Sequence, residues 1–599
     1  MQSPRTLVYL LRRDLRVADN PILYEVSRLA KQSPSAFTHF LPLYVFSAPQ
    51  IEISGFIPSA DARCPYPEAR SPVGGFWRCG PHRARFLAEA VWDLKSGLEE
   101  VGSGLEVRVG QILDVVTSLV ANDGQRKGEI VGIWMTGEEG VEEKREERDV
   151  RRVATEHGVE FKLWSDEKYL VDDRDLPFQK PHQLPDVFTS YRKMVEPLRG
   201  APRRTLPKPQ SLPPLPPSSA IPTQFKPFAV PATLDGTVDA LLAPLQQDLG
   251  LKHPPARPDG VRSAHPFRGG EQAGHERVRH LLTSGAMTAY KETRNGLLGL
   301  DFSTKLSAWL ALGCLTARQT HEYLVAFEDG TSELGRAADG YGKGENRGTA
   351  AVRFELLWRD YMRLCTRKFG PRLFRVEGFR DDTSVSWHSP HKDVETRKKV
   401  ERFLEGTTGM GLIDASMREL FLTGWTSNRA RQNVASFLAK HLGIDWRVGA
   451  EWYEMLLTDY DVSSNWGNWQ YTAGVGNDPR GEGRVFNPVK QAFDYDHNGE
   501  YTKAWVPELR RLDHAAMVFQ AWQVPTEQRR TLGLEGLEWV EKPLKRIDYH
   551  GGKGRGRGGG GGGGGGRSRG QYRGQGRGRG RGRRGAMDRV RAADEAATS

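Results

Sequence analysis

The chain has 599 residues, of which 38% are hydrophobic and 27% are charged. Because this length exceeds what one hydrophobic core supports, two or more domains are expected. The lack of a long apolar run argues against a membrane span, and the scattered cysteines argue against a disulfide framework or a zinc site.

Short apolar runs near the N-terminus alternate with longer segments of helical spacing such as residues 84–98. The runs are 7–11, 41–46, 105–109, 130–135 and 161–164. This alternation is typical of a parallel sheet covered by helices. We therefore expect a doubly wound α/β domain over residues 1–198. No apolar signal core precedes it, so the expected location is the nucleus or the cytoplasm.

Residues 199–269 are rich in proline, which predicts a connector that crosses the surface. Amphipathic spacing then dominates from 270 to 523 and predicts an all-α domain with a C-terminal extension over 524–545. The expected helices include 274–282, 305–326, 352–368 and 413–422. Between them, residues 328–348 are polar and rich in glycine, which predicts a long mobile loop.

The tail, residues 546–599, contains the segment 551–585, whose ten arginines and one lysine account for the whole net charge of +11. Its glycine content prevents a packed core, so we expect disorder. Arginine interleaved with glycine is typical of RGG segments, which follow single-stranded nucleic acids, including RNA. A solubilising role or binding to a protein partner is the alternative.

Hydroxyl side chains gather at Ser303, Thr304 and Ser307, at the expected start of an apolar helix. The unpaired N–H groups of a helix N-terminus attract anions, and Lys305 would add a full charge. An ordinary N-cap is the alternative interpretation.

Two further clusters combine charge with aromatic rings. Glu355, Trp358 and Arg359 share one helix face and could hold a nucleotide, or form a salt bridge beside a packing ring. In the segment 424–471, the side chains of Asn428, Arg431 and Gln432 also share one helix face, and Asp459, Asp461 and Asn465 follow in a turn. If these groups are buried, their hydrogen-bonding capacity requires a polar ligand.

The segments "STKLSAWLALG", "ELLWRDY" and "TSNRARQNVASFLAKHLGIDWR…NWGNWQYTAGVGNDPR" resemble the flavin-binding domain of photolyases and cryptochromes. "HPFRGGE", "YKETRNGLLG" and "LPDVFTSYRKMVE" are similar to the DASH cryptochrome branch. The resemblance covers residues 5 to about 520 and leaves out the connector, the glycine-rich loop and the tail.

The resemblance implies a bound FAD in a folded conformation. The implied FAD-binding residues are Tyr290, Ser303, Thr304, Lys305, Leu306, Ser307, Arg359, Asn428, Arg431, Asp459, Asp461 and Asn465. Among them, Asn465 matches the residue that faces flavin N5. The resemblance also implies an electron relay from the surface to the flavin through Trp387, Trp446 and Trp469.

Glu355, Trp358 and Asn428 match positions that contact the lesion in photolyases that repair cyclobutane pyrimidine dimers. The implied enzyme is a deoxyribodipyrimidine photolyase, in which excited reduced FAD donates an electron to the dimer. Tyr471 replaces the tryptophan of those photolyases, which implies a preference for single-stranded DNA, where extruding the lesion costs less. Asn428 and Gln432 occupy the positions where (6-4) photolyases place two histidines, which disfavours that activity.

Glu143 lies in a segment similar to the one that binds a methenyltetrahydrofolate antenna, although a solvated, glutamate-rich helix start is an equal alternative. The leading hypothesis is a monomeric blue-light repair enzyme for single-stranded DNA. A light-signalling cryptochrome that acts through its tail, and a nucleic-acid-binding protein with a vestigial flavin, are the alternatives.

Overall fold

The computed structural model describes residues 4–32, 36–59, 61–121, 128–261, 266–479, 485–547 and 549. Residues up to Asp548 form one compact unit. The arginine- and glycine-rich segment 551–585 lies outside the described residues, so its predicted disorder stays a prediction.

The N-terminal part is a parallel sheet with the strand order β3-β2-β1-β4-β5. Its strands are β1 (Arg5–Leu11), β2 (His39–Ser47), β3 (Glu106–Gly110), β4 (Glu129–Thr136) and β5 (Glu160–Trp164). Each strand overlaps one of the predicted apolar runs. The runs are apolar because the middle strands are buried on both faces, as in other doubly wound sheets.

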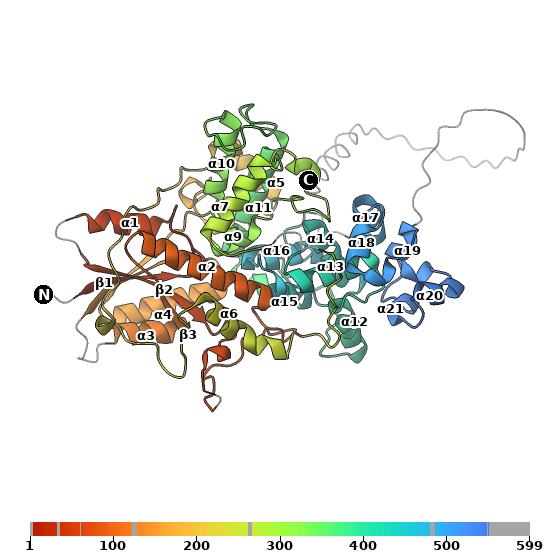
Figure 1. Ribbon diagram of the computed structural model, residues 1–599, viewed down its shortest axis with the longest axis horizontal. Coiled ribbons are helices and arrows are strands. Elements are labelled where there is room, and N and C mark those ends of the chain that lie inside the picture. The colour runs from red at the N-terminus through yellow and green to blue at the C-terminus, as the bar shows by residue number, and fades with distance from the viewer. Residues whose placement is uncertain are drawn as a thin grey trace, which may run out of the picture. The chain divides into compact units, whose positions relative to one another are not determined.

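Helices cover both faces of this sheet (Figure 1). Helices α1 (Pro21–Ala30) and α2 (Pro81–Glu100) lie on one side, and α3 (Ile112–Val120) and α4 (Val141–Glu156) lie on the other. Right-handed crossovers produce this distribution, because the chain moves outward from β1 in one direction and then returns to the other side. The predicted α/β fold is confirmed.

The proline-rich connector is more structured than expected. Its helix α6 (Leu234–Leu242) packs against α2. Further upstream, the Gln224 side chain accepts a hydrogen bond from the Val109 N–H (3.0 Å) and donates one to the Val109 carbonyl oxygen (2.9 Å). The connector thereby covers the outer edge of β3, which would otherwise expose unpaired backbone groups.

Helices form the remainder of the described chain, as predicted. They are α5 (Phe188–Val195), α7 (Glu271–Thr283), α8 (Tyr290–Thr293), α9 (Ser307–Leu312), α10 (Ala317–Asp329), α11 (Arg347–Phe369), α12 (Val394–Leu404), α13 (Gly411–Thr423), α14 (Asn428–Ser436), α15 (Trp446–Leu456), α16 (Val462–Ala473), α17 (Pro488–Tyr495), α18 (Glu500–Trp505), α19 (Ala515–Phe519), α20 (Thr526–Leu532) and α21 (Glu538–Glu541). None of the described helices is both long and apolar enough to cross a bilayer.

The single helix predicted over 305–326 is wrong, because the chain forms α9 and α10 instead. Gly313 ends α9 with a φ of 67°, and a Cβ atom there would lie 2.2 Å from the Arg13 carbonyl oxygen. Thr316 then caps α10 by accepting a hydrogen bond from the Gln319 N–H. The break lets the sheet domain approach the helical domain closely.

The expectation of a long mobile loop over 328–348 is also wrong. The Tyr341 hydroxyl donates to the Ser332 carbonyl oxygen (2.5 Å), and the Gly344 N–H donates to the Glu328 carbonyl oxygen (2.9 Å). Buried Arg353 joins both ends of the segment, through Glu328 (2.7 Å) and Glu345 (2.8 Å). The segment is therefore anchored to the helical domain at both ends.

Candidate functional site

The hydroxyl-rich segment before α9 has an unusual backbone. Ser303 and Lys305 adopt positive φ values of 65° and 54°, and Thr304 between them does not. Alternation of this kind turns successive N–H groups toward one concavity, which is an anion-binding nest. Because α9 has only six residues, this nest replaces the helix N-terminus that the sequence suggested.

Lys305 does not offer its charge to a ligand, contrary to the sequence-based expectation. Its ammonium group donates to the carbonyl oxygens of Gly299 (2.7 Å), Leu300 (2.7 Å) and Phe302 (2.8 Å). Burial and nearby Arg277 lower the pKa of Lys305 to about 7, although three acceptors are satisfied only by an ammonium group. The side chain therefore fixes the loop, and only the backbone of Lys305 remains for an anion.

Asp459 joins three distant segments beside this loop. Its carboxylate accepts hydrogen bonds from Ser307 Oγ (2.7 Å) and from the guanidinium group of Arg431 (2.9 Å). Ser307 begins α9, Arg431 belongs to α14, and Asp459 precedes α16. The expected approach of Arg431 and Asp459 is present, and Ser307 adds a contact that the sequence did not indicate.

Asp461 lies two residues further on and caps α16 by accepting a hydrogen bond from the Ser464 N–H (2.7 Å). The Arg359 guanidinium group and this hydrogen bond keep the pKa of the half-buried Asp461 carboxyl below its usual value. Asn465, one turn into α16, is 8% exposed and donates to the Ala450 carbonyl oxygen (2.9 Å). Its amide is therefore held in a fixed orientation.

Two buried polar atoms near these residues have no hydrogen-bond partner in the part of the chain that the structure describes. They are Nη1 of Arg359 and the hydroxyl oxygen of Tyr453. The electrostatic neighbours of Tyr453 include Arg431 and Asp459, and burial raises the pKa of its hydroxyl. Such unsatisfied groups are costly unless a ligand completes them. Together with the nest, they fit FAD, which carries phosphate, hydroxyl and heteroaromatic acceptors.

The sequence did not identify Tyr453 as a possible ligand-binding residue, because a tyrosine on an apolar helix face is equally well explained by packing.

Of the three relay tryptophans, Trp469 and Trp446 are buried and Trp387 is half-buried. A Cβ atom at Gly449 would lie 2.1 Å from the Trp469 ring, so α15 and α16 touch there. Trp446 begins α15, one helical turn before Gly449. The backbone next to Trp387 pairs with the same end of α15, through His388 and Gly443 (2.8 Å). Trp469 therefore contacts α15, Trp446 begins it and Trp387 lies beside its N-terminal end, and the relay through them stays a prediction.

The implied lesion residues gather around α11. Glu355 forms an ion pair with Arg294 (2.6 Å), and burial raises the pKa of its carboxyl despite this cation. Buried Tyr290 lies close to both, with its ring centroid 5.8 Å from the Arg294 guanidinium carbon. Asn428 is exposed at the start of α14.

Trp358 and Tyr471 form an edge-to-face pair, with ring centroids 5.8 Å apart at 81°. The Trp358 indole N–H also lies 3.4 Å from the side-chain oxygen of exposed Asn468. Phe188 of α5 packs against the other side of Trp358, at 4.4 Å between centroids. The pair therefore has a fixed geometry, and the sequence missed Asn468 and Phe188 because their proximity depends on the tertiary fold.

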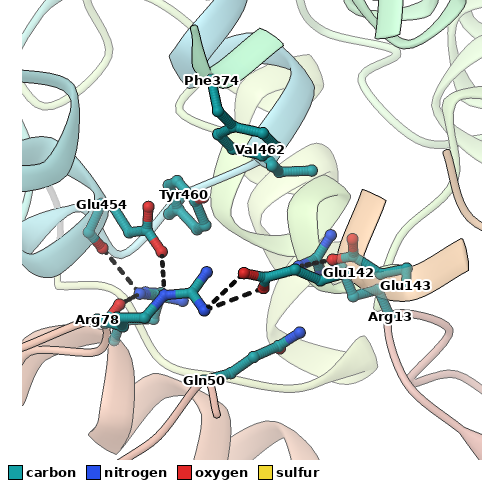
Figure 2. A pocket seen from close by; sticks show the side chains of 10 residues that line it. Arg13, Gln50, Arg78, Glu142, Glu143, Phe374, Glu454, Tyr460 and Val462 are labelled. Carbon is teal, nitrogen blue, oxygen red and sulfur yellow. Dashed lines mark hydrogen bonds and ion pairs between the residues drawn. The ribbon is translucent and has the colours of Figure 1, made fainter. Parts of the chain in front are cut away.

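A separate pocket lies between α4, α15 and the segment that precedes α16 (Figure 2). Glu143 lines it, but its carboxylate is 6% exposed and pairs with Arg13 (2.8 Å). Phe374, Tyr460 and Val462 form the apolar part of the lining. Glu142 reaches Arg78 (2.9 Å), which also pairs with Glu454 (3.0 Å). The sequence indicated Glu143 alone among these residues.

Two family models match this chain, one in its N-terminal part and one in its C-terminal part. Residues 7–213 match the DNA photolyase model, and residues 352–544 match the FAD binding domain of DNA photolyase.

Individual relatives match over most of their length. A protein of Neurospora crassa named "Putative cryptochrome DASH, mitochondrial" is 53% identical over 92% of this chain and 76% of its own. A Danio rerio "Cryptochrome DASH" is 40% identical over 85% of this chain and 84% of its own. The crystal structure of a Synechocystis cryptochrome superposes with a TM-score of 0.72 and 34% identity, over 89% of this chain and 95% of that one.

These relatives overturn one expectation. The Neurospora protein is named mitochondrial, and an Ostreococcus tauri relative, 36% identical over 88% of each chain, is named chloroplastic/mitochondrial. The expected nuclear or cytoplasmic location is therefore wrong. The apolar core considered at the N-terminus is a feature of secretory signal peptides. Organelle transit peptides are amphipathic and rich in arginine, so the lack of an apolar core does not argue against them.

Proposed function

Since this chain belongs to the DASH cryptochromes of the photolyase family and carries their FAD-binding domain, we propose that it repairs cyclobutane pyrimidine dimers in single-stranded DNA under blue light. The observation that supports the proposal is the set of residues implied to contact the lesion, with Glu355 and Trp358 on α11, Tyr471 in contact with Trp358, and Asn428 at the start of α14. It combines a carboxyl, an exposed amide and a fixed pair of rings.

Bound FAD supplies the electron donor. The residues that would hold it are the nest around Thr304, the Asp459–Arg431 pair and the side chains of Arg359 and Tyr453. Asn465 would orient its fixed amide toward the flavin, because its donation to Ala450 leaves the side-chain oxygen for another partner. A neutral amide at this place tolerates a protonated flavin nitrogen.

On the lesion side, Trp358 and Tyr471 would pack against the two bases of the dimer. Glu355 holds its proton more strongly than a free carboxylic acid, since burial raises its pKa. A protonated Glu355 can donate a hydrogen bond to a pyrimidine carbonyl, on which negative charge develops when the dimer receives an electron. Asn428 offers amide groups for the edge of the second base.

The preference for single strands follows from the cost of extrusion. A dimer in a duplex must leave the stack and lose its pairing, at a cost of a few kcal/mol. Tyr471 offers a smaller ring than tryptophan, so less stacking energy is available to offset that cost. A dimer in a single strand reaches Trp358 and Tyr471 without the cost of leaving a paired duplex.

The pocket beside Glu143 is our candidate for the methenyltetrahydrofolate antenna. Phe374 and Tyr460 supply aromatic surface, and the carboxylates of Glu142 and Glu143 line the same pocket. Because Glu143 is held by Arg13, we propose that Glu142, which is 44% exposed, offers the more accessible carboxylate.

We also propose residence in mitochondria, on the names of the Neurospora and Ostreococcus relatives. A C-terminal fluorescent fusion that accumulates in the nucleus or the cytosol instead would refute it.

The experiment for the repair function uses an oligonucleotide with one thymine dimer, chemically reduced FAD-loaded protein and blue light, with a dark control. We expect light-dependent loss of the dimer, faster in the single strand than in the duplex. An unchanged dimer in both would exclude repair and favour the signalling alternative.

A further inference from the structure

Trp466 is a large buried side chain that the proposed relay does not use. Its ring centroid lies 5.8 Å from that of Trp446, at an angle of 81°, and 4.8 Å from that of Phe374. Only 4% of the residue is exposed. The middle tryptophan of the proposed relay therefore contacts an indole that is not one of the three relay residues.

The indole N–H of Trp466 faces a carboxylate. Its Nε1 atom lies 3.3 Å from Oε2 of Glu454 and 3.2 Å from the Tyr460 hydroxyl oxygen. The other carboxylate oxygen of Glu454 accepts from Arg78 (3.0 Å), so Glu454 is fixed between a guanidinium group and the indole. Glu454 and Tyr460 also line the pocket that contains Glu143 (Figure 2).

This arrangement exceeds what packing alone requires. A buried carboxylate 3.3 Å from an indole stabilises positive charge on that indole, because charges interact strongly in a low-dielectric interior. An oxidised indole is also a far stronger acid than a neutral one, and the carboxylate is a ready acceptor for its proton.

We propose that Trp466 is a side branch of the electron relay, with Glu454 as its proton acceptor. The inference depends on the relay part of the proposed function. Bound FAD would supply the one-electron oxidant on photoexcitation, and the step on this chain begins with a radical cation on Trp446. Trp466 then gives one electron to Trp446, which returns to its neutral state, and the positive charge moves to Trp466.

A proton transfer completes the step. The proton on Nε1 of Trp466 passes to Oε2 of Glu454, which leaves a neutral radical on Trp466 and a neutral carboxylic acid on Glu454. Return of the electron from the flavin would then require that proton to return as well. The branch therefore prolongs the separation of charge without help from the surface.

The branch ends at Trp466 because Tyr460 is a poor next step. The guanidinium carbon of Arg83 lies 4.7 Å from the centre of the Tyr460 ring. This cation disfavours positive charge on the phenol. Tyr460 also has its hydroxyl directed at the indole N–H rather than at a recorded proton acceptor.

The test blocks the surface end of the relay first. In FAD-loaded full-length protein with Trp387→Phe, we expect flavin photoreduction to persist at a reduced rate, and pulsed-light spectroscopy to detect a neutral tryptophan radical. In the double variant Trp387→Phe/Trp466→Phe, the photoreduction rate should fall by a further factor of about ten, which corresponds to a barrier roughly 1.4 kcal/mol higher. Equal rates in the single and double variants would overturn the branch.

Two more variants separate this result from misfolding. In Trp387→Phe/Glu454→Gln both indoles remain, and we expect the long-lived radical to be the protonated cation instead of the neutral form. An unchanged neutral-radical yield there would contradict the role of Glu454. The control is Trp387→Phe/Trp452→Phe. Trp452 is a fully buried tryptophan of α15, the helix that also carries Trp446 and Glu454, and its ring packs against Phe76 and Phe421. This control should match Trp387→Phe alone, and a tenfold loss there would also overturn the branch.

The two proposals fail separately. If Trp469→Phe leaves photoreduction at the parent rate, the relay itself is misassigned. If Trp469→Phe abolishes photoreduction and Trp466→Phe has no effect in the Trp387→Phe background, only the branch is wrong.

Discussion

Gly449 is a single position on which the geometry of the relay depends. A methyl group there would lie 2.1 Å from the Trp469 ring, so Gly449→Ala must displace either that ring or helix α15. We expect slower flavin photoreduction and a loss of about 1–3 kcal/mol in the free energy of unfolding, as for other overpacked sites.

The matched control for this prediction is Gly97→Ala in α2, where the nearest atom is a side-chain methyl group of Val17 at 3.0 Å. It should leave photoreduction unchanged. If Gly449→Ala also photoreduces at the parent rate, Trp469 does not carry the electron.

Glu419 makes stability depend on pH. Its carboxylate accepts hydrogen bonds from the hydroxyls of Tyr501 (2.7 Å) and Thr426 (2.9 Å), and burial raises its pKa to about 7. Because the folded state binds this proton more tightly than the unfolded state, its contribution to stability is complete below the unfolded pKa. It is lost as the pH rises through about 7, for a total of up to about 3 kcal/mol.

Glu419→Gln removes this titration. The melting temperature of the variant relative to the parent should therefore rise between pH 5 and pH 8, as calorimetry in matched buffers can measure. A constant offset between the two proteins across that range would contradict the prediction.

Several single residues of the site were visible in the sequence and others were not. The polar side chains of Arg431 and Asp459 were expected to converge, and the structure joins them, whereas the contact of Asp459 with Ser307 was not foreseen. The side-chain charge of Lys305 is not directed at the anion site as expected, since no pattern reveals that three carbonyl groups would surround its ammonium group. The contact between Trp466 and Glu454 also leaves no sign in the sequence, because the two residues belong to different helices.

At the scale of elements, the segment between α10 and α11 is anchored by a fully buried ion pair. Arg353 and Glu328 have no exposed side-chain surface and lie 2.7 Å apart. Arg353→Met leaves the Glu328 carboxylate with only Arg199 as a cationic partner. We expect a loss of about 3–5 kcal/mol in unfolding free energy and faster proteolysis within residues 330–346.

Arg336→Ala is the control, since Arg336 lies in the same segment and pairs with Glu333 only at the exposed surface. Its stability should change by less than about 1 kcal/mol. Equal effects of the two substitutions would show that the buried pair does not anchor the segment.

Strands and helices could be predicted from the sequence where their burial requires apolar residues. The five strands appear as apolar runs because helices cover both faces of the sheet. The break between α9 and α10 was not predictable, because it depends on how closely Gly313 approaches Arg13 from the other domain. The same holds for the segment 328–348, where glycine and charge indicated mobility but buried partners fix the backbone.

For the whole molecule, contacts between the sheet domain and the helical domain hold the site together. Asp19 accepts hydrogen bonds from Thr316 (2.7 Å) and pairs with Arg318, and Glu271 accepts from the Val17 N–H (2.7 Å). These contacts lie at both ends of the α9 region, which carries Ser307. The sheet domain therefore supports the position of the flavin-binding segment.

Charge is concentrated outside this folded part. Residues 551–585 carry all of the net charge, so removing everything after Tyr549 should weaken binding to undamaged single-stranded DNA and reduce its dependence on salt. Titrations at two salt concentrations measure both effects. A tail with every arginine of 551–585 replaced by glutamine is the control and should behave like the truncation. Equal affinity and equal salt dependence in the truncated and full-length proteins would exclude the tail as a nucleic-acid element.

The proposed repair beside the Trp358–Tyr471 pair acts on a dimer that is already unstacked. The most direct measurement compares the rate of light-driven repair for one thymine dimer in three settings: a single strand, a duplex with an unpaired bubble at the lesion, and a fully paired duplex. We predict equal rates for the single strand and the bubble, and slower repair in the paired duplex. Equal repair in all three settings, or repair in none, would contradict the account.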